Sequence, residues 1–474
     1  MAYRINARKQ MELLPPSIED YVRKKDPVRA YDAFVDALNF YDLGIEINPS
    51  KVGCPQYDPR AMLKLLIYGY SYGIRSSRKL ERATHHNISF IWLTSGLKPD
   101  HKTIAEFRRK NKKALSNVLK QCARLCIKLG LIDGNTLFVD GSKIRGNASI
   151  KNSWTKKKCA KVLSKIDRRI EAILAECETI DQQEADRFSL VEMDEELINV
   201  NALKSKVKQI LKTLEDEGKK SINTVDPECT RINSVHGSHA GYNAQIAVDE
   251  KHGLIISSEV VSENNDLNQF ANQVNQANET LENKCEVACA DSGYADTDTL
   301  EKIDDQKIVV VVPSQRQASK KEPGQFDKRR FQYDADRDCY ICPEGQILPY
   351  RRTDKWKKNK VYQSTDKMIC RQCHHFGECT KNLKGRQIRR LINEEMRQKL
   401  EAQYERPECQ ATYSKRKEKV ELPFGHIKRN LKLDAFLLRG RDGVNAEFSL
   451  LGSSFNIVRM INILGIGVFI NQIL

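Results

Sequence analysis

Apolar residues recur every three or four positions through the first 130 residues, with short polar joints between the periodic stretches. The clearest stretches are YDAFVDALNFYDL, PRAMLKLLIYGYSYG and NVLKQCARLCIKLG. This spacing places the apolar side chains on one face of a helix. No alternating strand pattern competes with it, so we expect an all-α N-terminal domain over residues 1–130.

After residue 130 the pattern changes to that of a mixed α/β domain. A β-rich run, Leu137–Val139, ends at Asp140 and Gly141 in the manner of a strand closing in a turn. Two alternating runs in GYNAQIAVDEKHGLIISSEVVS surround Glu250–Gly253, which predicts a β-hairpin.

Helices and short buried strands then alternate. The stretches NDLNQFANQVNQANETLENK and TDTLEKIDDQ predict helices, and CEVACAD, which ends at Asp291, and KIVVVVP predict strands. The full order is strand, hairpin, helix, strand, helix, strand. That order predicts a mixed α/β sheet of the ribonuclease H type.

Two segments interrupt this order and are predicted insertions. Residues 151–225 are charged and helically periodic, which predicts a helical hairpin. Residues 314–385 are polar, basic and cysteine-bearing, which predicts a β-rich insertion. The α/β domain is then made of residues 131–313 and 386–474, and its last part, from Leu391, is helical. Its apolar C-terminal stretch is interrupted by Arg459, so we expect a core helix and no membrane span.

The charge balance narrows the class of partner. Lys and Arg number 79 against 63 Asp and Glu, a net charge of +16 with a pI near 9.1. An excess of this size favours a polyanionic partner, with nucleic acid as the first candidate. The alternative is a basic protein that binds nothing anionic.

The cysteines predict a metal site. The N-terminus MAYRINARKQMELLPPSIED has no signal-peptide pattern, so we expect a reducing cytoplasm, where the 14 cysteines act as ligands or as buried thiols. Two C-x2-C pairs are separated by 27 intervening residues, with His374, His375 and Cys379 close by; the pairs are Cys339 with Cys342 and Cys370 with Cys373. This spacing favours structural zinc. Reduced thiols in a β-rich insertion are the alternative.

Carboxylates suggest a second metal site. Asp140 and Asp291 lie at the ends of predicted strands, where sites collect in open α/β sheets. Phosphoryl transfer on DNA uses two divalent cations bridged by carboxylates. The alternative is that each aspartate caps a turn. A helical stretch, YSKRKEKVELPFGHIKRN, offers Glu418 and Glu421 as a third carboxylate, and Pro423 is expected to kink that helix.

With these residues the chain resembles a bacterial insertion-sequence transposase of the DDE class. The match runs over almost the whole chain, through FVDGSKIRGNAS, GYNAQIAVD, ADSGYAD, AFLLRGRDGVNAEFSLL and the N-terminal YDPRAMLKLLIYGYSYGIRSSRKLERATHH. The resemblance implies Asp140, Asp291 and Glu421 as a catalytic triad that holds Mg²⁺ or Mn²⁺. It also implies that Tyr413, Arg416 and Lys428 hold DNA near the scissile phosphate, although four residues separate Arg416 from Glu421 where much of the group has three.

DNA recognition is expected at two further places. Basic residues cluster on the N-terminal helices, among them Arg75, Arg78 and Arg108, although a basic solvated face gives the same pattern. In the second insertion, RRTDKWKKNK combines basic residues with Trp356, which is suited to stack on an unpaired base.

The expected function is cleavage and transfer of insertion-sequence ends. The partners are double-stranded DNA and, by analogy, a second copy of the chain in a homodimer, with the protein associated with the bacterial nucleoid. Two other functions stay open. One is a DNA-binding protein descended from a transposase, and the other is a nuclease that cuts DNA without strand transfer.

Overall fold

The computed structural model describes residues 17–47, 56–181, 187–234, 237–319, 322, 324–356 and 358–473. These form two compact units. The first unit holds Met1–Asp266, Asn275–Lys284 and Glu418–Leu474, and the second holds Leu267–Val274 and Cys285–Lys417. The division passes through two helices, α11 (Phe270–Leu281) and α16 (Pro407–Arg429). Parts of the predicted N-terminal domain, residues 1–16 and 48–55, lie outside the described residues.

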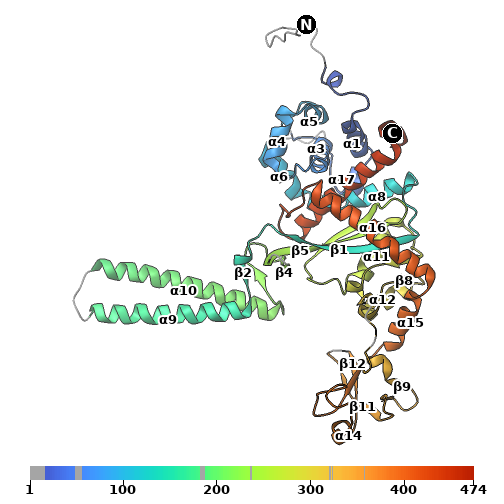
Figure 1. The fold of residues 1–474 in the computed structure, drawn as a ribbon. Helices are drawn as coiled ribbons and strands as arrows, with labels where there is room; N and C mark the ends of the chain where they lie inside the picture. The colour runs from blue at the N-terminus through green and yellow to red at the C-terminus, as the bar shows by residue number, and fades with distance from the viewer. Residues whose placement is uncertain are drawn as a thin grey trace, which may run out of the picture. The chain divides into compact units, whose positions relative to one another are not determined.

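The first unit begins with helices, as predicted (Figure 1). They are α1 (Pro27–Asp36), α2 (Phe40–Leu43), α3 (Pro59–Ser71), α4 (Ser77–His86), α5 (Ile88–Leu93), α6 (His101–Lys110), α7 (Lys112–Ser116) and α8 (Val118–Lys128). Asp26 and Asp58 cap the first turns of α1 and α3, and each is followed by a proline at the first helical position. That local sequence fixes where both helices start.

Antiparallel strands form the sheet of the first unit. A long strand, β5 (Gly237–Asp249), pairs with β1 (Thr136–Arg145), β4 (Thr230–Ser234) and β6 (Ile255–Val261). The predicted hairpin is therefore confirmed as β5 and β6. The predicted end of the first strand is wrong, because β1 continues past Asp140 to Arg145, held by its pairing with β5.

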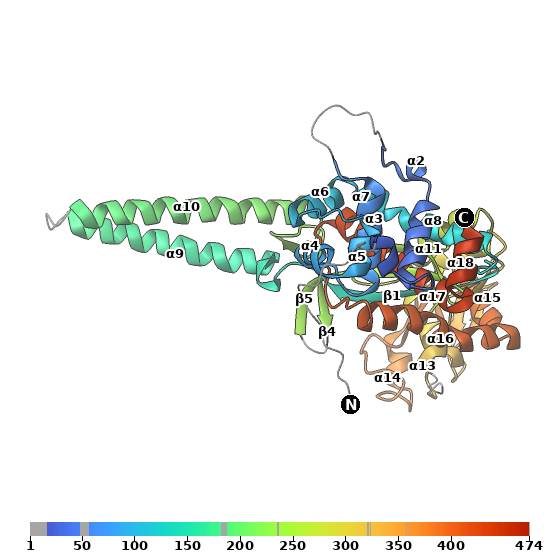
Figure 2. The same cartoon turned by 90° about the horizontal axis from the view of Figure 1, so that it is seen from above.

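One buried helix packs against both the helices and the sheet. This is α17 (Arg441–Leu464), which contacts α3, α7, α8 and β6, and it is followed by α18 (Ile466–Ile473) against α1 (Figure 2). The predicted C-terminal core helix is thus confirmed. No helix in the described ranges is by itself long and apolar enough to cross a membrane; α17 and α18 pass that test only as a pair bent by 110°.

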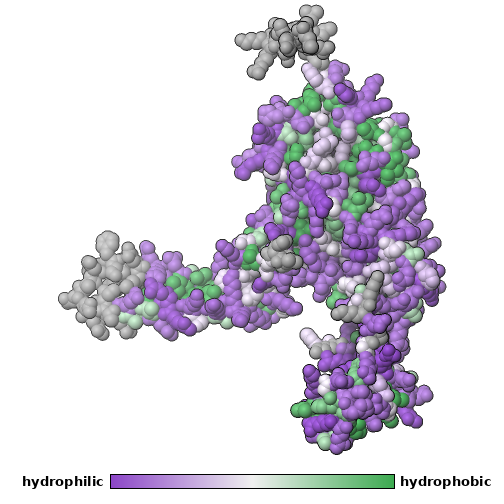
Figure 3. Space-filling model, in the orientation of Figure 1, coloured by the Kyte–Doolittle hydropathy of each residue, from purple (hydrophilic) through white to green (hydrophobic). Residues whose placement is uncertain are grey.

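A helical hairpin follows β1 in the chain. Its helices, α9 (Lys156–Asp181) and α10 (Arg187–Asp216), lie side by side in both ribbon views (Figures 1 and 2). Buried side chains between them include Ile166 and Val207. At its base, β2 (Ser153–Trp154) pairs with β3 (Ile222–Asn223). Hydrophilic residues cover much of the face of this hairpin seen in Figure 3.

The second unit contains a parallel strand pair and a separate small sheet. Strand β7 (Val287–Cys289) runs parallel to β8 (Val309–Val311), with α12 (Thr297–Asp304) between them in sequence, as predicted. Parallel and antiparallel pairs together confirm the mixed α/β class.

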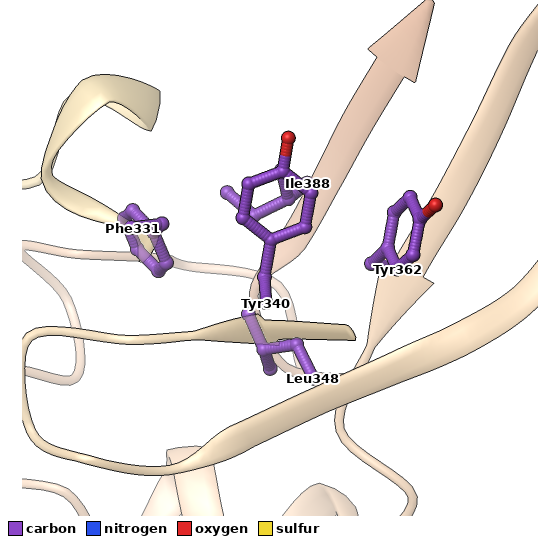
Figure 4. Packing of buried hydrophobic residues seen from close by; sticks show 5 residues of the cluster. All are labelled: Phe331, Tyr340, Leu348, Tyr362 and Ile388. Carbon is purple, nitrogen blue, oxygen red and sulfur yellow. The ribbon is translucent and has the colours of Figure 1, made fainter. Parts of the chain in front are cut away.

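The small sheet has the order β13-β12-β11-β10-β9. Its strands are β9 (Gln332–Asp334), β10 (Cys339–Ile341), β11 (Ile347–Asp354), β12 (Asn359–Gln363) and β13 (Gln387–Leu391). The helix α14 (Lys367–Arg371) lies between β12 and β13 in the chain, whereas α15 (Glu394–Tyr404) contacts β8 and α12, and α13 (Gln315–Ser319) contacts the 3-10 helix Ser292–Tyr294. Because β13 pairs with β12, this sheet extends past residue 385, the predicted end of the insertion. Its core is small, and Figure 4 shows it: Phe331, Tyr340, Leu348, Tyr362 and Ile388.

Candidate active site and nucleic-acid interface

Asp140 lies in the middle of β1, where its backbone pairs with Ile246. Side chains two residues apart on a strand share a face, so Asp140 and Ser142 lie together. The Nζ atom of Lys428, from α16, donates a hydrogen bond of 2.5 Å to the Ser142 hydroxyl. Burial lowers the pKa of Lys428, and the nearby Asp140 charge opposes that shift. The first unit thus brings Asp140, Ser142 and Lys428 together.

Asp291 follows β7 and begins a short 3-10 helix, Ser292–Tyr294. Its Oδ1 atom accepts a hydrogen bond of 2.7 Å from the Gly293 backbone N–H. Its Oδ2 atom lies 3.2 Å from the Arg416 guanidinium. The Asp291 side chain nevertheless keeps 41% of its surface exposed, which leaves it accessible to ligands.

Tyr413 belongs to the same group of side chains as Asp291. Burial raises the pKa of Tyr413, with Arg416 opposing and Asp291 adding to the shift. Its ring packs edge-on against Tyr404 at a centroid distance of 5.3 Å. The second unit therefore places Asp291, Tyr413 and Arg416 next to one another.

Glu421 is exposed on α16, in the part of that helix that belongs to the first unit. It precedes Lys428 by seven residues, nearly two helical turns, so the two share a face of the helix. The helix α16 continues through Pro423. Sequence reasoning missed Ser142, although the period-two alternation from Asp140 could have identified it.

Two predicted DNA-binding arginines lie inside the helical region. Arg75 is 8% exposed, and its guanidinium contacts the Glu447 carboxylate at 2.6 Å. Arg108 is 5% exposed and donates hydrogen bonds to the Arg75 carbonyl oxygen and to the hydroxyls of Tyr70 and Ser77. Because both guanidinium groups are buried, neither is accessible to a DNA phosphate. We therefore remove both arginines from the candidate interface.

Other cations of this region remain at the surface. Arg78, Lys79 and Arg82 are exposed on α4. Arg109, on α6, is exposed as well, but its guanidinium donates two hydrogen bonds to Glu106, at 2.7 and 2.6 Å. The candidate interface in the N-terminal region is therefore the exposed basic face of α4.

Two segments of this chain match known protein families. A model described as Transposase domain (DUF772) matches residues 16–110, and one described as Transposase DDE domain matches residues 341–461. Both matched models describe transposase domains, and together they support an insertion-sequence transposase of the DDE class. The first match covers the helices that carry Arg78, and the second covers Glu421 and Lys428. No curated protein matches the chain.

The family assignment agrees with the architecture. A helical N-terminal region and a mixed α/β core are consistent with the ribonuclease H-like fold of DDE transposases. Asp140 and Asp291 lie outside the two matched segments. Their assignment therefore depends on the sequence motifs and on the contacts described above.

Trp356 stands in the turn between β11 and β12, with 92% of its surface exposed. An indole so exposed is available for stacking on a base. Nearby, Lys358 pairs with Asp298, and Lys357 lies outside the described residues.

The predicted zinc ligands do not all lie together. Cys342, Cys370 and Cys373 line one cavity, where they are joined by Cys379. Cys339 is instead buried within β10, whose neighbouring strands pair with it on both sides. The thiols that line the cavity therefore differ from the predicted set, because they include Cys379 and do not include Cys339.

Proposed function

We propose that this transposase cleaves the ends of an insertion sequence and joins them to target DNA, with Asp140, Asp291 and Glu421 as its metal-binding carboxylates. The observation that carries the proposal is the pair of transposase family matches in one chain. The contacts of Lys428 with Ser142 and of Arg416 with Asp291 support it, because each brings a cation to a candidate carboxylate.

The donor chemistry fits a divalent cation. Carboxylate oxygens are the ligands that Mg²⁺ and Mn²⁺ prefer. Asp291 is partly exposed and Glu421 is exposed, so both are accessible donors. Bound there, the cations would lower the pKa of the attacking hydroxyl or water and offset charge on the phosphate.

The remaining groups of this chain position the DNA. In the first step a water oxygen bonds to phosphorus and the bond to the 3′ oxygen breaks, which frees a 3′-hydroxyl. In the second step that hydroxyl attacks a target phosphate and a target 3′ oxygen leaves. We expect Lys428 and Arg416 to stabilise the additional negative charge of each transition state.

A strand-transfer assay with labelled end DNA and Mg²⁺ tests this function. We expect a joined product whose formation needs the divalent cation. Cleavage with no joined product would assign a nuclease instead. Retention of end DNA with neither cleavage nor joining would assign a DNA-binding protein. A homodimer that pairs two ends is part of the proposal, and crosslinking on end DNA tests it.

Arg78 is proposed to contact a DNA phosphate. Replacing Arg78 with Ala should weaken binding of end and unrelated DNA alike, because a phosphate contact carries no sequence information. The slope of log affinity against log salt should fall by about 0.9 for one lost contact. Fluorescence anisotropy at several salt concentrations measures both.

Arg109→Ala is the matched control for Arg78→Ala. It removes the same charge from a neighbouring helix, but from a guanidinium that pairs with Glu106. We expect a smaller change in slope for this variant. Equal changes for the two variants would mean that general charge, and no contact on α4, accounts for binding.

A further inference from the structure

Four thiols from the turn after β10 and from the segment between β12 and β13 line one cavity in the second unit. They are Cys342, Cys370, Cys373 and Cys379. Cys342 and Cys379 also pack against the aromatic core of this sheet, shown in Figure 4. Four sulfur ligands are a donor set typical of a structural zinc site.

The backbone around Cys342 suits a thiolate. Cys342 begins the tight turn between β10 and β11, in which the Gly345 N–H donates to the Cys342 carbonyl oxygen at 2.8 Å. The Gln346 N–H donates to the Cys342 sulfur at 3.3 Å. An N–H directed at sulfur stabilises the charged form, which is the form that binds metal.

The space around Cys370 is kept open by a glycine. Gly385 has a φ of 86°, a conformation that side-chain-bearing residues rarely adopt. A Cβ atom at this position would lie 3.1 Å from the Cys370 sulfur. A side chain at position 385 would therefore strain the backbone and crowd the Cys370 thiol.

Cys379 is the fourth member of the group. It lines the same cavity as Cys342, Cys370 and Cys373. Cys339 does not line this cavity; it is buried within β10, which pairs with a strand on each side. The cavity lining therefore selects Cys379 over Cys339.

An alternative ligand set lies at the edge of this cavity. Side-chain atoms of Glu344, His374 and His375 lie within 4.8 Å of one another. This group offers three ligands, of which Glu344 and His374 are exposed. The His375 ring also packs against Phe326 at a centroid distance of 4.8 Å. The four thiols are less closely gathered than this group, but they are partly buried and are the ligands more typical of structural zinc.

We propose that Cys342, Cys370, Cys373 and Cys379 bind one structural Zn²⁺. The metal would link the turn after β10 to the segment between β12 and β13. The sheet has a small apolar core, and small domains with such cores commonly depend on a metal for stability. The proposal is independent of the proposed function, since it places no group of this site in DNA cleavage.

Metal analysis of the full chain tests the site. We expect the protein purified without added metal to carry about one zinc per chain. Replacement of the zinc by Co²⁺ should give the near-ultraviolet thiolate-to-cobalt absorption and the visible bands of a tetrahedral site. Protein that carries no zinc after purification, takes up no Co²⁺, or carries iron with its visible absorption would overturn the proposal.

Matched variants separate the two cysteine sets and the histidine set. Cys379→Ser should lose most of the zinc, whereas Cys339→Ser should keep it. A variant with both His374→Ala and His375→Ala should also keep it. Zinc retained in Cys379→Ser but lost in Cys339→Ser or in the histidine variant would overturn the assignment. If Cys379→Ser fails to fold, the Co²⁺ spectra of the other two variants and of the unaltered chain still decide between the sets.

Discussion

Asp291→Asn should abolish cleavage of end DNA while leaving end binding nearly intact. The substitution keeps the size of the side chain and its capacity to accept from the Gly293 N–H, but it removes the charge that holds a cation. Metal-ion catalysis supplies several kcal/mol of transition-state stabilisation, so a loss on the order of 1000-fold in rate is expected. Single-turnover cleavage measures the rate, and anisotropy measures the binding.

Asp296→Asn is the control for this variant. Asp296 lies five residues further along the chain and caps α12 through the Thr299 N–H. Asparagine caps a helix about as well as aspartate does, so this variant should cleave at close to the normal rate. Normal cleavage by Asp291→Asn would contradict the assignment of Asp291 as a metal ligand. Equal losses in both variants would point to a disturbed loop.

Glu447→Ala should strongly destabilise the first unit. The Glu447 carboxylate is fully buried, and it accepts hydrogen bonds from Arg75 and from the backbone N–H groups of Leu437 and Leu438. Its removal would leave the Arg75 charge buried with its carboxylate partner gone. Breaking a buried pair in this way typically costs about 3–5 kcal/mol in the free energy of unfolding. Urea unfolding followed by circular dichroism measures the change.

Two further variants show whether the buried charge is the cause. Arg75→Met combined with Glu447→Leu removes both charges and should recover much of the lost stability. Glu106→Ala breaks an exposed pair with Arg109 and should leave the unfolding midpoint almost unchanged. A double variant as unstable as Glu447→Ala would show that the fold needs the hydrogen bonds themselves.

Periodicity along the chain predicted the element types well. The hairpin of β5 and β6 and the strand that precedes Asp291 follow from local patterns of apolar and turn residues. The end of β1 does not follow from its local sequence. Asp140 and Gly141 resemble a turn locally, but pairing with the long strand β5 keeps the chain extended through Arg145. Tertiary pairing overrode local propensity there.

Side-chain roles were harder to predict than elements. Arg75 and Arg78 stand three residues apart in a basic run, yet Arg75 is buried and Arg78 is exposed. The partner that makes burial of Arg75 favourable, Glu447, is 372 residues away in sequence. No local pattern contains that information, since burial of a charge depends on a distant counter-charge.

The cysteines illustrate a similar limit. The repeated C-x2-C spacing suggested that Cys339 and Cys342 act as a pair. In the fold, Cys339 belongs to the strand and Cys342 to the turn that follows it, so the two thiols lie in different surroundings. The motif spacing pointed to this region of the chain, but it could not show that the strand register separates Cys339 from the thiols that line the cavity.

The short pairing of β2 with β3 bears on how this chain can vary. Because Ser153 and Asn223 are backbone partners, the chain leaves for the helical hairpin and returns at nearly the same point. Whole turns could be added to both helices, or taken from them, with no change in the spacing of the two attachment points. The reach of this arm is therefore a quantity that evolution, or an engineer, can adjust separately from the rest of the protein.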